Sequence, residues 1–205
     1  AAALAFGVGF ARGDFIAPFR PFGPIQALYS AELLLTGVLG HRIFARYWQR
    51  QDAGADPNAP GVFFWLISGW GFAWLALDDF FELHERLGSW LEGYGAAIPL
   101  LNHADDTVVF LYGVAAVGLI YLFYGHLRAS RAPFTLLALG FLWTGFYLTV
   151  DFFVPEGTVL AGLEEPANLA ANAFFLSAYL VKYREVSQAG RRADRLQEAS
   201  ATSGK

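Results

Sequence analysis

Five apolar segments, each close to the length of a membrane-crossing helix, constrain this chain more than any other feature. They cover about residues 24–48, 61–83, 106–125, 133–154 and 165–183. A tilted helix needs about 20 apolar residues to cross about 30 Å of hydrocarbon. Because hydrocarbon cannot satisfy free backbone groups, helices are the default structure for such segments. The sequence therefore predicts an all-α integral membrane bundle of five transmembrane helices.

The composition of the chain agrees with this prediction. The 205 residues are 56% hydrophobic, 17% aromatic and only 16% charged, whereas an average soluble domain is about 25% charged. These values argue against a disordered chain, a nucleic-acid binder and most soluble enzymes. The chain contains no cysteine, which excludes disulfides, thiolate metal sites and cysteine nucleophiles.

Basic residues gather on one side of the five spans. The C-terminal ends of spans one, three and five, together with the segments that follow them, hold 11 basic and five acidic residues, whereas the opposite side holds three basic and 13 acidic residues. Because basic residues prefer cytoplasmic loops, we expect the N-terminus outside and the C-terminus in the cytoplasm. The 11 basic residues are Arg42, Arg46, Arg50, Arg128, Arg131, Lys182, Arg184, Arg191, Arg192, Arg195 and Lys205.

Residues 1–186 then form a single transmembrane domain, and residues 187–205 form a polar cytoplasmic tail. The basic residues of this tail could contact anionic lipid headgroups. A solvated, flexible terminus is the simpler interpretation.

Each span also brings a carboxylate toward the outer side. A charged side chain at mid-membrane costs at least about 2.5–3.5 kcal/mol, so these polar stripes are expected to face one another rather than lipid. Crowded carboxylates repel, and protons, a basic partner or a metal ion must offset that repulsion. Hard cations take oxygen ligands, and di-metal sites in helix bundles combine carboxylates with histidines.

We therefore interpret the outer cluster as a candidate site for a divalent metal ion, with Fe, Mn, Mg and Ca all left open. The candidate ligands are Glu32, Asp78, Glu82, His103, Asp106 and Glu165. At 100° per residue, Asp78, Glu82 and Glu85 share one face of a continuous helix, and His84 falls nearly opposite. The helix-face argument therefore leaves His84 out of the set.

Two other interpretations of the same residues stay open. The first is a buried polar network without metal. The second is ordinary capping, because Asp105, Asp106, Glu164 and Glu165 lie at predicted helix starts, where carboxylates match the helix dipole. Capping does not account for Glu32, which lies about two turns deeper.

The stretch LALDDFFELHERLG resembles a segment of uncharacterised bacterial multi-pass membrane proteins, in which an apolar helix runs into Leu-Asp-Glu/Asp and then Leu-His-Glu. It covers about 14 residues. The resemblance implies that Asp78, Asp79, His84 and Glu85 are the matching positions, and it implies no activity. Together with the charge bias, it predicts a multi-pass protein of a bacterial inner (cytoplasmic) membrane.

Two functions remain open from the sequence. One is a metal-binding membrane protein of unknown reaction. The other is a non-catalytic accessory subunit of a larger respiratory or photosynthetic membrane complex, with aromatic residues packing on other membrane subunits or lipid. Glycine-rich phosphate loops and Gly-x-Ser-x-Gly motifs are missing from the sequence, so the residues do not decide whether the protein is an enzyme.

Overall fold

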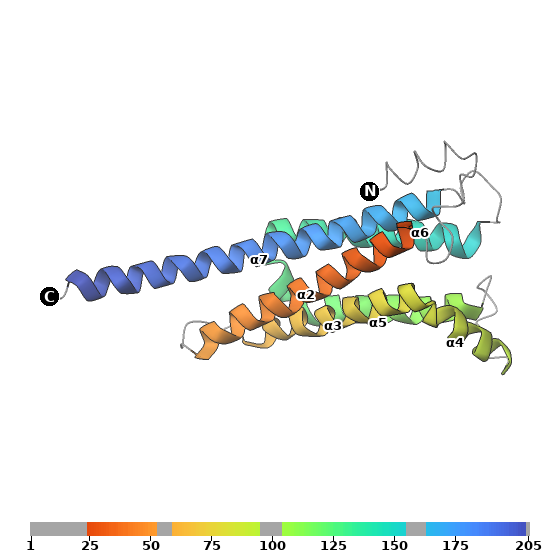
Figure 1. Ribbon diagram of the computed structural model, residues 1–205, viewed down its shortest axis with the longest axis horizontal. Helices are drawn as coiled ribbons and strands as arrows, with labels where there is room; N and C mark the ends of the chain where they lie inside the picture. The colour runs from red at the N-terminus through yellow and green to blue at the C-terminus, as the bar shows by residue number, and fades with distance from the viewer. Residues whose placement is uncertain (1–23, 53–58, 95–103, 155–162, 204–205) are drawn as a thin grey trace.

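The computed structural model of the chain describes residues 24–52, 59–94, 104–154 and 163–203. Over these residues the protein is all-helical, as the sequence predicts. Its elements are α2 (Pro24–Asp52), α3 (Ala59–Phe81), α4 (Leu83–Glu92), α5 (Ala104–Leu127), α6 (Arg131–Phe153) and α7 (Glu164–Ser203). All except α4 are long, and they lie side by side with α2, α5 and α7 running one way and α3 and α6 the other (Figure 1).

Three helices are long and apolar enough to cross a membrane: Gly61–Phe81 in α3, Asp105–Leu127 in α5 and Arg131–Phe153 in α6. These segments correspond to the second, third and fourth predicted spans. The first and fifth predicted spans are also helical, but α2 and α7 carry more polar and charged residues along their length.

Helix α7 runs for 40 residues and continues to Ser203. The flexible terminus favoured from residue 187 onward is therefore wrong in conformation. Its Ala, Arg, Gln, Leu and Glu residues are strong helix formers, and residues 164–183 have already nucleated the helix. In Figure 1 the last part of α7 extends beyond the other helices.

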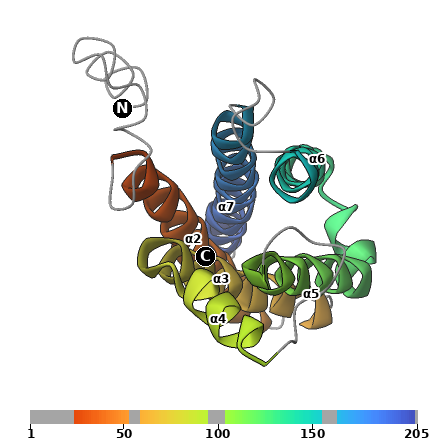
Figure 2. The same ribbon diagram turned by 90° about the vertical axis from the view of Figure 1, so that its right-hand side faces the viewer.

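The helices pack as two pairs that α7 connects. Helix α2 packs mainly on α3, α6 packs mainly on α7, and α7 also contacts α2 along its length. Viewed from the end, α7 lies between α2 and α6, and α5 lies beside α3 and α4 (Figure 2). The core at the end of the bundle opposite α4 contains Ile43, Tyr47, Trp65 and Tyr179.

Glycines allow the closest helix contact, between α2 and α3. A Cβ atom on Gly37 would lie 2.8 Å from the carbonyl oxygen of Gly69, and one on Gly40 would lie 2.8 Å from the Gly69 Cα. Such distances leave no room for a side chain, so the two backbones touch directly. Nearby, the Tyr179 hydroxyl donates a 2.5 Å hydrogen bond to Ser68 Oγ and ties α7 to the same pair.

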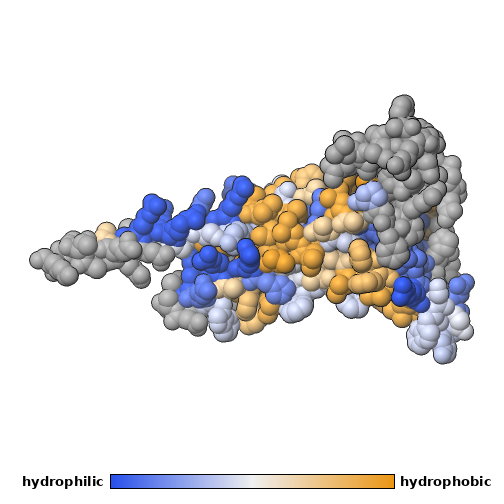
Figure 3. Space-filling model, in the orientation of Figure 1, coloured by the Kyte–Doolittle hydropathy of each residue, from blue (hydrophilic) through white to orange (hydrophobic). Residues whose placement is uncertain are grey.

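Helix α5 is the least enclosed of the long helices. Tyr121 is 80% exposed and Leu122 is 75% exposed, and the apolar Leu111, Val114 and Val117 are also open. Apolar side chains of this size require lipid or a partner around them. Figure 3 shows apolar surface across the middle of the molecule, with hydrophilic surface toward both ends.

We predict that Gly37→Val destabilises the protein by about 1–3 kcal/mol, because the added side chain forces α2 and α3 apart. Gly113→Val is the control, since nothing lies within 4 Å of a Cβ at that position. Thermal unfolding in detergent, followed by tryptophan fluorescence, measures both. Equal melting temperatures for the two variants would contradict the close contact.

Candidate functional site

The helix that begins as α3 breaks at Glu82. This residue has φ 53° and ψ 44°, the left-handed conformation, and it is the one described non-glycine residue with positive φ. A side chain in this region costs about 1–2 kcal/mol, and such strain is concentrated at functional sites. After the break, α4 bends away from the axis of α3 and lies beside the start of α5 (Figure 1).

Gly88 fixes the position of α4. A Cβ atom on this residue would lie 2.4 Å from the Asp105 backbone nitrogen, so only glycine allows α4 to approach α5 this closely. The Glu82 side chain makes no capping hydrogen bond to α4. Glu82 instead lines the cavity described below.

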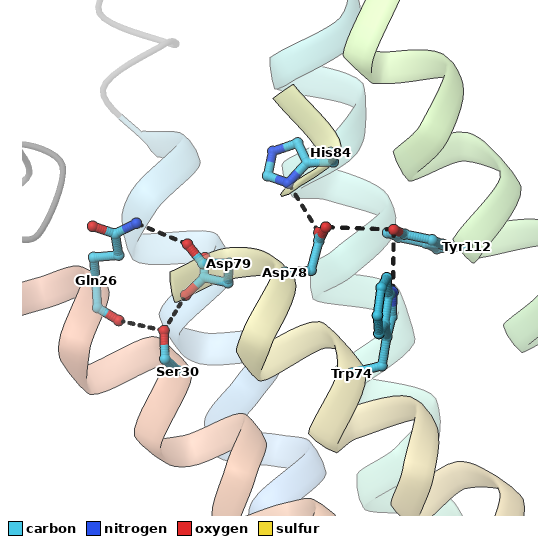
Figure 4. Close-up of polar contacts among 7 residues, drawn as sticks. All are labelled: Gln26, Ser30, Trp74, Asp78, Asp79, His84 and Tyr112. Carbon is cyan, nitrogen blue, oxygen red and sulfur yellow. Dashed lines mark hydrogen bonds and ion pairs between the residues drawn. The ribbon is translucent and has the colours of Figure 1, made fainter. Parts of the chain in front are cut away.

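Two neighbouring aspartates at the end of α3 accept hydrogen bonds from different helices on opposite sides of α3 (Figure 4). Asp79 Oδ2 accepts a 2.6 Å hydrogen bond from Ser30 Oγ, and the Asp79 carbonyl accepts a 2.8 Å hydrogen bond from Gln26 Nε2. Both donors belong to α2. Asp79 therefore fastens the end of α3 to the first turns of α2.

Asp78 points toward α4 and α5 instead, and it is only 4% exposed. His84 Nδ1 lies 2.9 Å from Asp78 Oδ2, and the Tyr112 hydroxyl donates to Asp78 Oδ1 at 3.4 Å. Tyr112 in turn accepts a hydrogen bond from Trp74 Nε1 at 3.2 Å. This chain of contacts connects α3, α4 and α5 through one buried carboxylate (Figure 4).

A third carboxylate joins α2 to the start of α7. The Tyr29 hydroxyl donates to Glu165 Oε2 at 2.6 Å and also lies 2.9 Å from the Glu165 carbonyl oxygen. Tyr29 is 4% exposed. A buried hydroxyl beside a carboxylate makes a strong, charge-assisted hydrogen bond.

A cavity of about 220 Å³ lies among these residues, and we call it the carboxylate pocket. Its walls come from α2, the end of α3, α4, α6 and α7. It is smaller than the about 300–1,000 Å³ of typical small-molecule sites, so it suits a small ion with a few waters. Its lining residues are Ile25, Gln26, Tyr29, Asp79, Glu82, His84, Glu85, Tyr147, Glu164, Glu165 and Asn168.

The charge of the pocket is one-sided. Five of its lining residues are carboxylic acids, and none of the described residues that line it is Lys or Arg. Among the described lining residues, His84 is the single side chain able to carry a positive charge. The pocket therefore presents a strongly negative surface, with two tyrosines among its lining residues.

The electrostatics of α4 reflect this crowding. Burial lowers the pKa of His84, but the hydrogen bond to Asp78 and the charges of Asp78, Glu85 and Asp105 outweigh it, so the net pKa is raised. Burial and the neighbouring Glu82 charge raise the pKa of Glu85. Both shifts favour the protonated forms, as expected where negative charges are close together.

The family follows from a comparison with known proteins. A family model described as a domain of unknown function (DUF8692) matches residues 3–183. The chain belongs to this family. No curated protein and no solved structure matches it. The description of the family carries no activity, so it leaves the resemblance of the LALDDFFELHERLG stretch a prediction, and the function rests on the site.

The structure brings some of the predicted site residues together and separates others. Glu82 and Glu165 line the same pocket. Asp78 lies next to it, behind His84. Asp106 is buried at the start of α5, and Glu32 is half-buried further along α2; neither lines the pocket. His103 lies outside the described residues.

No group of three or more His, Asp or Glu side chains in the described part of the chain is already arranged to hold a metal ion. The predicted metal site therefore remains a hypothesis. The Glu32 Oε2 atom is buried and has no hydrogen-bond partner among the described residues, which agrees with its placement in the interior rather than at a capped helix end.

The helix-face argument missed His84, Asp79 and Tyr29. It places His84 nearly opposite Asp78 on a continuous helix, and this is wrong because the helix breaks at Glu82. The left-handed turn brings His84 back to Asp78. The sequence signal that could have found it was the Leu-His-Glu part of the resemblance, which implies His84 as a matching position.

We predict that the protein loses stability as pH rises through the raised pKa of His84. A group whose pKa is higher in the folded state stabilises it fully below the unfolded pKa, about 6.5 for histidine, and this contribution disappears above the folded pKa. Thermal unfolding between about pH 5.5 and 8.5 in a metal chelator measures the slope. His84→Gln should flatten it, and an unchanged slope in that variant would contradict the assignment to His84.

Proposed function

We propose that this protein is an integral membrane protein whose carboxylate pocket binds a divalent metal ion. The observation that carries the proposal is the pocket itself: five carboxylic acids surround about 220 Å³, and none of the described lining residues is Lys or Arg. No reaction is assigned to it.

The estimated repulsion between the carboxylates favours a bound cation over an empty negative pocket. Two like charges about 8 Å apart repel by about 2 kcal/mol at an effective dielectric constant of about 20. Glu164 and Glu165 gain from the N-terminus of α7, but a helix dipole contributes only about 0.3–1 kcal/mol. Five acids around one small cavity therefore need protons, a cation or both.

The donor set fits a divalent ion. Asp79, Glu82 and Glu165 would supply hard oxygen ligands, which Mg²⁺, Ca²⁺ and Mn²⁺ prefer. His84 could supply a nitrogen, because it lines the pocket and its Nδ1 is held by Asp78, which leaves Nε2 as the other ring nitrogen. A ligating histidine commonly has its second nitrogen hydrogen-bonded to a carboxylate. A bound ion would bring charge compensation to this end of the bundle.

The test is the thermal stability of the purified protein in detergent after metal removal. We predict that Mg²⁺, Ca²⁺ or Mn²⁺ raises the melting temperature, with about 2.7 kcal/mol of stabilisation at 100 times the dissociation constant. Glu82→Gln and Glu165→Gln should lose most of this effect. Glu92→Gln is the matched control, because Glu92 is exposed at the end of α4 and outside the pocket.

The Glu82→Gly variant separates the role of Glu82 in metal binding from the backbone strain at this position. Glycine adopts the left-handed conformation without steric cost, so this variant should stay as stable as the wild type without metal while losing the metal response. If no divalent ion shifts the melting temperature of the wild-type protein, the metal proposal fails. The alternative role, an accessory subunit of a larger membrane complex, then remains, supported by the exposed apolar face of α5.

The same proposal includes a five-span topology with the N-terminus outside and the C-terminus in the cytoplasm of a bacterial inner membrane. Helices α2 and α7 lie beside the three apolar spans, and consecutive long helices of the chain run in opposite directions (Figure 1). The acidic pocket lies at one end of the bundle, and the arginines of α2 and the second half of α7 lie toward the other. This polarity supports the orientation that basic residues impose.

We predict that a protease site inserted after Gln188 is cut only from the cytoplasmic side. Digestion of intact spheroplasts should leave the site whole, and digestion of inverted vesicles should cleave it. A site inserted after Glu92, near the pocket, should behave in the opposite way. Cleavage after Gln188 in intact spheroplasts would reverse the orientation and place the carboxylate pocket in the cytoplasm.

A further inference from the structure

Arginines form a continuous row on the second half of α2. Arg42, Arg46 and Arg50 are spaced four residues apart, and residues at this spacing lie on one helix face. Arg42 and Arg46 are exposed, and Arg50 is half-buried. This row lies at the end of the bundle opposite the carboxylate pocket.

Helix α7 brings two more arginines to the same place. Arg184 and Arg191 are both exposed and are two helical turns apart, so they share a face. The Arg46 side chain lies beside the Tyr183 side chain. Further along, a Cβ on Gly190 would lie 3.9 Å from the Arg50 guanidinium. We call this surface the arginine patch: Arg42, Arg46, Arg50, Arg184 and Arg191.

The described side chains give this patch little compensating charge. Glu185 is the acidic side chain described on this part of α7, and its carboxylate lies 3.6 Å from the Lys182 ammonium. Lys182 is buried and also donates to Ser130 Oγ. The patch therefore keeps an excess of positive charge that an anion from outside the chain can balance.

The depth of the patch matches the headgroup layer. Arg184 follows Glu164 by 20 residues of helix, a rise of about 30 Å, which equals the thickness of the hydrocarbon. Arg191 lies about 10 Å further along, within the polar layer. Trp48 on α2 is 45% exposed at this level, as is typical of interfacial aromatics. In Figure 3, hydrophilic surface toward the left of the view lies directly beside the apolar surface of the middle.

We propose that the arginine patch binds the phosphate headgroup of an anionic phospholipid. Guanidinium groups bind phosphate oxygens in pairs of parallel hydrogen bonds. The adjoining apolar surface gives the acyl chains a place to lie, which a free phosphate ion would not use. This inference rests on the proposed membrane spans in α2 and α7, and it is independent of the metal proposal and of the direction in which the protein is inserted.

The test uses the full-length protein in a neutral detergent, with native mass spectrometry to count bound lipids. Dioleoylphosphatidylglycerol should stay bound, and dioleoylphosphatidylcholine should dissociate. The double variant Arg46→Gln/Arg184→Gln should lower the affinity for phosphatidylglycerol about thirtyfold, because each basic side chain near an anionic surface contributes about fivefold. Arg128→Gln/Arg131→Gln removes two charges near the α5–α6 turn and is the matched control.

Three outcomes would overturn the proposal. An equal loss in the control variant would mean that the total charge matters and the patch does not. Equal retention of phosphatidylcholine would mean that the headgroup is not recognised. Full competition by inorganic phosphate at the concentration of the lipid would assign the patch to a small soluble anion. The wild-type lipid comparison stands even if the double variant fails to fold.

Discussion

The carboxylates of Asp78 and Asp79 hold the acidic end of this bundle together, because each must find donors on a different side of α3. A buried carboxylate without a partner costs far more than one that accepts hydrogen bonds. Asp79 meets this requirement with Ser30 of α2, and Asp78 meets it with His84 of α4 and Tyr112 of α5. The positions of three helices therefore depend on two adjacent residues.

The break at Glu82 follows from that arrangement. A continuous helix would carry His84 away from Asp78, and the left-handed turn returns it. The strain of about 1–2 kcal/mol is offset by a hydrogen bond to a charged group, which contributes about 1.5–3 kcal/mol. The same turn places Glu82 in the wall of the carboxylate pocket. The left-handed turn at Glu82 thus accounts both for the backbone strain and for the position of Glu82 in the carboxylate pocket.

The sequence predicted the helical class because apolar runs of about 20 residues have few other structures open to them. It also predicted that Glu82 and Glu165, from distant spans, meet at one end, since polar faces avoid lipid. It could not predict the contact of His84 with Asp78, because helical spacing assumes an unbroken helix and no glycine marks the left-handed turn at Glu82. It also gave no sign that α7 stays helical to Ser203, since helix formers in a polar tail are equally common in flexible termini.

Helices α2 and α7 relate the two ends of the molecule. They run parallel and are in contact from Tyr29 and Glu165 at the carboxylate pocket to Arg46 and Tyr183 at the arginine patch. Both helices begin at the acidic end, so their positive N-terminal dipoles face the carboxylates. The proposed cation would bind in a pocket whose wall includes both helices, and the proposed lipid would bind across them at the other end. Because a ligand that binds only the folded state stabilises it by mass action, a cation and an anionic lipid would both oppose the separation of α2 from α7. The proposed cation and the proposed anionic lipid carry opposite charges, but both would stabilise the contact between these two helices.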